Sequence, residues 1–172
     1  MPTDDGLKIR EVRRFSRSGD GFAILFHERD DWGKCGHKTM LTEPTFFVDD
    51  DHLIEAITWE GGFDNLFRPM ETNARILGSF DFRRLSEAEP VKSSQLVQVT
   101  ENTFCSKREG NMAHYESAYD AENDRALFVG NGPTKNVIDL GKGVYLLMNK
   151  DEVIGLVLLD AKKKFESAKE MD

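Results

Sequence analysis

The stretch Val144–Phe165, VYLLMNKDEVIGLVLLDAKKKF, contains two apolar runs that are separated by a short charged segment. Short apolar runs bounded by turn-forming residues are typical of buried strands. We therefore predict that Val144–Met148 and Val153–Leu159 pair antiparallel, with Asn149–Glu152 at the turn. Because both runs are almost entirely apolar, both faces of this hairpin are expected to be covered, as in the centre of a sandwich.

Short strand-like runs also fill much of the remaining chain. Leu7–Phe15, Phe22–Glu28 and His37–Val48 combine apolar or β-branched residues with turn-forming neighbours. The tail that follows Leu159 has helical composition instead. These patterns predict a mainly β fold, an antiparallel meander that forms a sandwich or a half-open barrel, with one or two short helices.

Three segments near the middle of the sequence have less regular patterns. The acids before Leu53 can cap the start of a helix, so we expect a short helix over Asp50–Ile57, with a strand as the alternative. A helical turn is expected around Phe63–Phe67. In Ala74–Leu85 apolar residues alternate with charged ones, and this period of two predicts a strand.

The length of 172 residues is typical of one domain and suffices for a sizeable core. We expect a single domain over residues 1–172, with two subdomains, 1–85 and 95–165, as the alternative. The polar segment SEAEPVKSS, residues 86–94, would then be the linker between them.

The chain is acidic, because 23 lysines and arginines are outnumbered by 31 aspartates and glutamates, for a net charge of −8. This balance argues against direct nucleic-acid binding and against docking on anionic membranes, which both depend on basic surface. It is compatible with a protein partner, in particular a basic one. Two cysteines form no dense disulfide framework, and no apolar run has the length of a secretory signal or a membrane span, so we expect a cytoplasmic protein.

One catalytic arrangement is present in outline. Mg²⁺-dependent nucleases of the restriction type place carboxylates on neighbouring strands, followed by a lysine that stabilises charge in the transition state. Asp139, Asp160 and Lys162 occur in a suitable order. However, a Gly-Lys-Gly turn separates Asp139 from the apolar hairpin, and the acidic chain lacks the basic groove expected of a nuclease. The nuclease is therefore an alternative, and the sequence favours a protein that is not an enzyme.

Cys35 and His37 lie two residues apart and, on a strand, would share one face, as two zinc ligands can. A structural zinc site needs four ligands, usually in two such pairs, and the sequence offers one pair. We predict no metal and no other cofactor, and keep this pair as a weak alternative.

The segment TWEGGFDNLFRPM brings Trp59, Phe63 and Phe67 together around two glycines. Such a cluster can form the hot spot of a protein interface or, near the mouth of a β-barrel, the wall of a small-ligand site. Packing in the core is the ordinary alternative. A binding surface at this loop would also include the acids that flank it, namely Asp49, Asp50, Asp51 and Glu60.

In the C-terminal part of the chain, YDAENDRALFV is followed by GKGVYLLMNKDEVIGLVLLDAKK. Residues 119–165, about a quarter of the chain, resemble a small bacterial family called domain of unknown function 2283, on the following residues: Tyr119, Asp120, Asp124, Leu127, Phe128, Gly143, Val144, Asp151, Gly155, Leu159, Asp160 and Ala161. The resemblance implies a meander of short strands with charged hairpin turns. It assigns no catalytic residue, and Leu158 and Leu159 depart from the acid that is common there.

The sequence combines an acidic balance with an aromatic-rich loop and contains no coherent catalytic set. We therefore predict a non-catalytic binding or inhibitory protein that acts on another protein, of the type found in bacteria and their phages. Immunity proteins and defence inhibitors provide an analogy of type. The Mg²⁺-dependent nuclease and a small-ligand-binding β-barrel are the alternatives.

Overall fold

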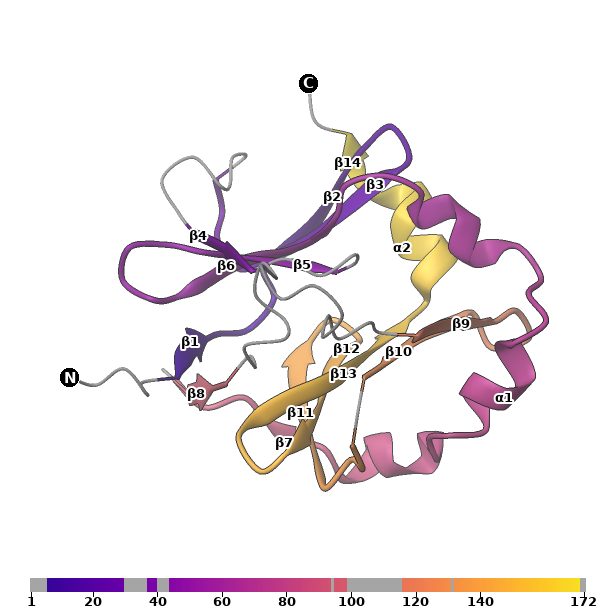
Figure 1. Cartoon of the computed structure of the whole chain (residues 1–172). Helices are drawn as coiled ribbons and strands as arrows, with labels where there is room; N and C mark the ends of the chain where they lie inside the picture. Colours follow the sequence, from indigo (N-terminus) through magenta and orange to yellow (C-terminus); the bar gives the residue numbers. More distant parts are fainter. Residues whose placement is uncertain are drawn as a thin grey trace, which may run out of the picture.

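The computed structural model describes residues 6–29, 37–39, 44–93, 95–98, 116–130 and 132–170, and these residues form a mainly β protein (Figure 1). One six-stranded sheet, the C-terminal sheet, has the order β7 (Glu89–Pro90), β11 (Asn136–Gly141), β12 (Val144–Asn149), β13 (Glu152–Leu159), β10 (Arg125–Val129), β9 (Glu116–Asp120). The other, the N-terminal sheet, has the order β14 (Lys169–Glu170), β2 (Arg14–Ser18), β3 (Gly21–Leu25), β6 (Ile54–Trp59), β5 (Thr45–Val48), β4 (His37–Thr39). A small third sheet pairs β1 (Leu7–Ile9) with β8 (Gln95–Val97).

The predicted hairpin is confirmed and lies at the centre of the C-terminal sheet. β12 and β13 pair antiparallel, and the pair Asn149 and Glu152 closes the turn. Leu156 faces the N-terminal sheet, as part of the largest hydrophobic cluster. Its neighbour Val157 belongs to a second cluster on the opposite face, together with Ile76 of α1 (Asn73–Leu77). Both faces of the hairpin are therefore covered, as its apolar composition predicts.

Gly155 is required where β13 passes between β10 and β12. A Cβ at this position would lie 2.5 Å from the carbonyl oxygen of Phe128 and 3.1 Å from a methyl group of Leu147. The register with β12 also shifts next to this point, between Leu147 and Met148. A glycine thus allows β10 and β12 to approach the middle of β13 closely.

The two large sheets pack face to face through an aromatic core. Trp59 of β6 and Phe128 of β10 have ring centroids 5.1 Å apart, so they join the two sheets directly. The cluster around them includes residues from both halves of the sequence, from Leu7 to Phe165. The sheets form a sandwich and are not closed into a barrel.

The prediction of a helix over Asp50–Ile57 is wrong, because β6 begins at Ile54. The Asp49 carboxylate accepts hydrogen bonds from the backbone N–H groups of Asp51 and Leu53, at 2.8 and 3.0 Å, and so forms a turn. An aspartate that bonds to nearby backbone favours a turn over a helix. The helical turn expected around residues 63–67 is confirmed as a 3₁₀ helix, η1 (Phe63–Phe67).

The prediction of a strand over Ala74–Leu85 is also wrong. This part of the chain forms α1 and a second 3₁₀ helix, η2 (Phe82–Glu87), and Asp81 caps η2 by accepting a bond from the N–H of Arg83 at 3.0 Å. Ile76 and Phe80, four residues apart, both pack on the outer face of the C-terminal sheet. Ile76 lies on α1 and Phe80 in the bend after it, so a short helix and a turn place both residues on the sheet where a strand was predicted.

The segment expected as a polar linker contributes to the C-terminal sheet. After η2, β7 pairs in parallel with β11, and the N–H of Val91 donates to the carbonyl of Asp139 at 3.0 Å. After the central strand β13, the helical tail is confirmed as α2 (Ala161–Ser167). Its Phe165 packs in the core beside Phe63, with ring centroids 5.4 Å apart, so α2 is fixed near β2 and β3 (Figure 1).

Candidate functional site

A basic pocket of about 450 Å³ opens between β2, the turn from β11 to β12, and α2. We call it the basic pocket and define it by its lining residues: Arg13, Arg14, Phe15, Lys142, Asp160, Lys163, Lys164, Ser167, Ala168 and Lys169. Six of these ten side chains are basic and one is acidic. The net charge of the whole chain is −8. The excess of acidic residues therefore lies outside this pocket.

Backbone hydrogen bonds bring the three walls together. β14 pairs in parallel with β2, and the hydroxyl of Ser16 donates to the carbonyl of Lys169 at 3.1 Å. On the opposite wall, the N–H of Leu159 donates to the carbonyl of Gly143 at 2.8 Å. This bond fixes the β11–β12 turn, and hence Lys142, beside the start of α2. The pocket is therefore built on regular elements of both sheets.

Lys164 is the half-buried cation of the pocket. Its Nζ donates to the carbonyl of Leu159 at 2.6 Å and lies 5.4 Å from the centre of the Phe15 ring. Burial lowers the pKa of Lys164, the charges of Asp160 and Asp124 oppose this, and the charge of Lys163 lowers it further. The protein therefore holds this ammonium group at an energetic cost that a bound anion would offset.

The other cations of the pocket have few acidic partners. Across the described residues, Lys142, Lys163, Lys164 and Lys169 form no ion pair. Arg13 lies 3.8 Å from Glu28, but the two side chains are 61% and 74% exposed, so this pair contributes little. The exposed ammonium groups of Lys142, Lys163 and Lys169 thus remain available for an anionic ligand.

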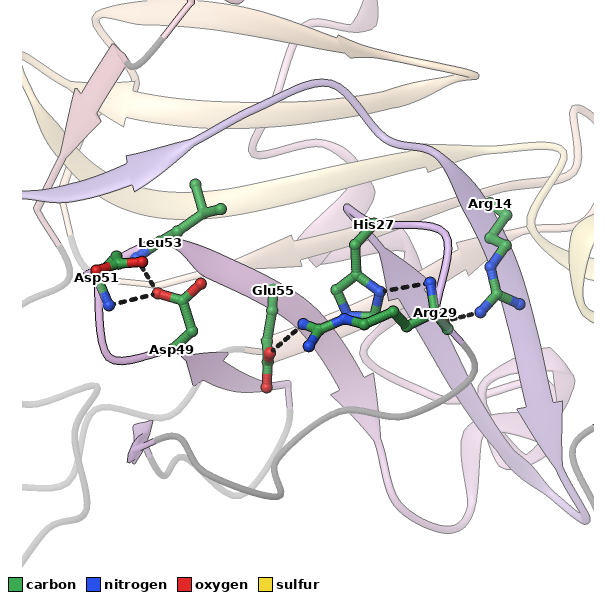
Figure 2. Close-up of polar contacts among 7 residues, drawn as sticks. All are labelled: Arg14, His27, Arg29, Asp49, Asp51, Leu53 and Glu55. Atoms are coloured by element: carbon green, nitrogen blue, oxygen red, sulfur yellow. Dashed lines mark hydrogen bonds and ion pairs between the residues drawn. The ribbon is translucent and has the colours of Figure 1, made fainter.

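Arg14 is held in place by a chain of polar contacts that runs into the N-terminal sheet (Figure 2). Its guanidinium donates to the carbonyl of Arg29, and the Arg29 side chain pairs with Glu55 at 3.2 Å. The Glu55 side chain is 7% exposed. Because a buried carboxylate needs a cationic partner, this pair fixes Arg29 and, through its carbonyl, the direction of Arg14.

Asp124 links the β9–β10 hairpin to the start of α2. Its carboxylate accepts from the backbone N–H groups of Lys162 and Lys163, at 2.7 and 3.2 Å, and from the Tyr119 hydroxyl at 2.8 Å. Burial, with a smaller contribution from Asp124, raises the pKa of Tyr119, so the phenol stays protonated and keeps donating. Asp124 thereby positions the turn of α2 that carries Lys163 and Lys164.

Replacing Asp124 by alanine should weaken this link. Loss of a helix cap costs about 1 kcal/mol, and alanine at the positive φ of 48° that Asp124 adopts costs about 1 kcal/mol more. We expect an unfolding free energy lower by about 2 kcal/mol in urea denaturation. Asp124→Asn, which keeps an acceptor oxygen and tolerates positive φ, should lose much less. Equal losses in the two variants would contradict the capping role.

The aromatic residues predicted as a binding surface do come together, but they do so in the interior. Trp59 and Phe63 are 3% and 2% exposed, with ring centroids 5.2 Å apart. Phe67 is half-buried and makes an edge contact with Phe63. The structure therefore places these rings where they stabilise the sandwich, whereas Glu60, next to Trp59, is exposed.

The predicted acidic residues Asp49, Asp50 and Asp51 form the turn between β5 and β6, where Figure 2 shows Asp49, Asp51 and Leu53 as a group of contacts separate from that of Arg14. Asp50 and Asp51 are exposed, and Asp49 is half-buried. The hydrogen bonds of Asp49 to the turn backbone explain why an aspartate is favoured at its position.

The residues of the nuclease alternative are divided between different places. Asp160 lines the basic pocket, whereas Lys162 is exposed on α2 and lines no wall of it. Asp139 lies on β11, which β12 separates from β13, and its carboxylate accepts from the N–H of Gly141 at 2.8 Å. Within the described ranges no three His, Cys, Asp or Glu residues are grouped as metal ligands. Cys35 and the side chain of His37, the weak zinc pair, lie outside the described residues.

Comparisons with known proteins give no further guide to this site. No family model matches the chain, and no curated protein or solved structure matches it. The resemblance of residues 119–165 to domain of unknown function 2283 stays a prediction. In the part of the chain that the structure describes, no helix has the length and apolar character needed to span a membrane.

Proposed function

We propose that this chain is a non-catalytic binding protein that holds a phosphate-bearing ligand in the basic pocket. The observation that carries the proposal is the lining itself: six of ten residues are basic, and four lysines among them form no ion pair across the described residues. Like charges that gather around one pocket repel one another and a bound anion would offset this repulsion, so a cluster of this kind supports a binding role.

The chemistry of the lining suits phosphate in particular. Arginine presents paired N–H donors to phosphate oxygens, and lysine supplies a compact charge that can reach the same group from another wall. A volume of about 450 Å³ admits a phosphorylated group of moderate size. Asp160 and Ser167 add one acceptor and one hydroxyl for a polar part of the ligand.

The expectation of a basic protein partner receives less support from the geometry. A protein interface needs large side chains at its surface as anchors, and Trp59 and Phe63 are enclosed in the core. The exposed acids Asp50, Asp51 and Glu60 have a simpler role under the present proposal. They repel anions from the rest of the surface and so favour their capture at the basic pocket.

Titration with pyrophosphate tests the proposal directly. We expect saturable binding by isothermal titration calorimetry. Lys163→Gln and Lys142→Asn should each weaken it about fivefold to tenfold, since each removes a charged contact. Asparagine is chosen for Lys142 because this residue has a φ of 54°, which asparagine tolerates. Lys135→Gln, an exposed lysine outside the lining, is the matched control and should leave the affinity unchanged.

Two results would reject the proposal. One is the absence of heat or saturation at millimolar pyrophosphate and low salt. The other is an equal loss of affinity in Lys135→Gln and Lys163→Gln, because binding would then follow general charge instead of the basic pocket. Thermal melting of each variant checks that the fold is retained.

A further inference from the structure

A second pocket of about 290 Å³ lies next to the basic pocket and shares Arg13 with it. Its lining residues are Arg10, Glu11, Arg13, Phe26, Val91, Lys92 and Ser93. Arg10, Arg13 and Lys92 give it a positive charge as well. Because one exposed arginine belongs to both walls, the two pockets are neighbouring parts of one basic surface.

From this geometry we infer that the two pockets form one groove, centred on Arg13, that binds a linear chain of phosphate groups. The inference rests on the proposed function, since the basic pocket is one half of the groove. It adds that the ligand is extended and repeats its charge along its length.

The segment between β1 and β2 forms the floor that joins the pockets. The N–H of Val12 donates to the carbonyl of Leu140 in the C-terminal sheet at 2.8 Å. The N–H of Arg13 donates to the carbonyl of Leu25 in the N-terminal sheet, also at 2.8 Å. Val12 is buried while Arg10 and Arg13 are exposed. The segment is thus fixed to both sheets with its arginine side chains toward solvent.

The cations of residues 10–14 are divided between the two pockets, with Arg10 in the second pocket and Arg14 in the basic pocket. Residues 10–14 contribute cations at both ends, and an extended run of this size spans at most about 14 Å. Lys92 lies on the wall of the second pocket, directly after Val91. The N–H of Val91 donates to the carbonyl of Asp139 on β11 at 3.0 Å, which fixes this wall to the C-terminal sheet. Lys163 and Lys164 stand on the wall of the other pocket. Both pockets therefore have more basic than acidic lining residues, with Glu11 as the acid of the second pocket and Asp160 as that of the basic pocket.

The side chains of the groove favour contact with a phosphate backbone over stacking with bases. Proteins that stack bases present exposed aromatic rings beside their basic groove. Here Phe26 is 2% exposed and Phe15 is half-buried. The large hydrophobic side chains exposed among the described residues, Met70 and Leu96, line neither pocket.

An acidic peptide is a less suitable ligand on physical grounds. Its carboxylates lie at the ends of flexible side chains, and ordering each costs up to about 2 kcal/mol. A chain of phosphates carries its charge on the backbone and avoids this additional cost of ordering side chains. The same repeated phosphate chemistry is present in inorganic polyphosphate and in single-stranded nucleic acid, and binding should be strongly salt-dependent with either.

The test compares a short and a long ligand on the full chain. Fluorescence anisotropy would measure labelled linear polyphosphate, a labelled single-stranded oligothymidine and a labelled glutamate peptide, with pyrophosphate titrated by calorimetry. We expect the long phosphate chain to bind at least about tenfold more tightly than pyrophosphate, because it contacts both pockets.

The variants separate the two halves of the groove. Arg10→Gln combined with Lys92→Gln should weaken the long ligand about tenfold and leave pyrophosphate unchanged, whereas Lys163→Gln should weaken both. Each lost phosphate contact should also reduce the slope of log affinity against log salt by about 0.7–0.9. Both changed residues of the double variant are exposed, and melting would confirm its fold.

Each outcome has a defined meaning. Pyrophosphate binding with no effect of the double variant on the long ligand would overturn the groove and leave the proposed function standing. No pyrophosphate binding would reject the proposed function itself. A glutamate peptide that binds as tightly as polyphosphate would overturn the phosphate class. Preference for polyphosphate or for oligothymidine would support the groove and identify the source of the phosphates.

Discussion

Replacing Leu156 by aspartate is expected to lower the free energy of unfolding by at least about 3 kcal/mol. Leu156 is 2% exposed, lies in the middle of β13 and faces the aromatic core between the sheets. An aspartate there would bury a charge among apolar side chains. It would also leave part of the volume of the leucine side chain empty. Circular-dichroism melting should show a midpoint lower by roughly 10 °C or a protein that no longer folds.

The matched control is the same change at an exposed strand position. Leu96 of β8 is 51% exposed, so Leu96→Asp introduces the same charge without burying it and should change stability by less than about 0.5 kcal/mol. A Leu156→Asp protein that melts like Leu96→Asp would show that the β12–β13 hairpin is not in the core.

The hairpin could be predicted because its information is local. The turn residues stand between two apolar runs, and any strand that is apolar on both faces must be covered on both. The boundary between helix and strand was harder in Ala74–Leu85. There apolar residues alternate as in a strand, but Ile76 packs from α1 and Phe80 from the bend after it on the outer face of the C-terminal sheet, and such tertiary packing is not visible in the local pattern.

The basic pocket could not be predicted from the sequence for a different reason. Its cations come from three distant segments, represented by Arg13, Lys142 and Lys163, and no segment alone has the character of a binding motif. The net charge of −8 obscured the cluster further, because a sum over the chain does not show how charge is distributed in space. The available signals were short: an Arg-Arg pair, a Gly-Lys-Gly turn and a run of three lysines, each of which is also common on ordinary surfaces.

Replacing Trp59 by alanine should have an effect of similar size, because this ring connects the two sheets. Its centroid lies 5.1 Å from that of Phe128 in the C-terminal sheet, and 5.2 and 6.0 Å from those of Phe63 and Phe22. Truncation of a buried tryptophan costs about 3–5 kcal/mol, because the contacts are lost and a cavity remains. Urea denaturation would measure this loss.

Trp59→Phe is the variant that makes this prediction specific. The indole Nε1 is buried and has no hydrogen-bond partner among the described residues. Phenylalanine keeps much of the ring contact and removes that unpaired donor, so it should cost less than half of the stability that alanine costs.

The alternative prediction, a surface hot spot, differs in its measurable result. Trp59→Ala would then melt like the wild type and would speed the dissociation of a bound protein partner. A core role instead requires that both variants bind pyrophosphate with wild-type affinity wherever they are folded, because Trp59 lines neither pocket of the groove.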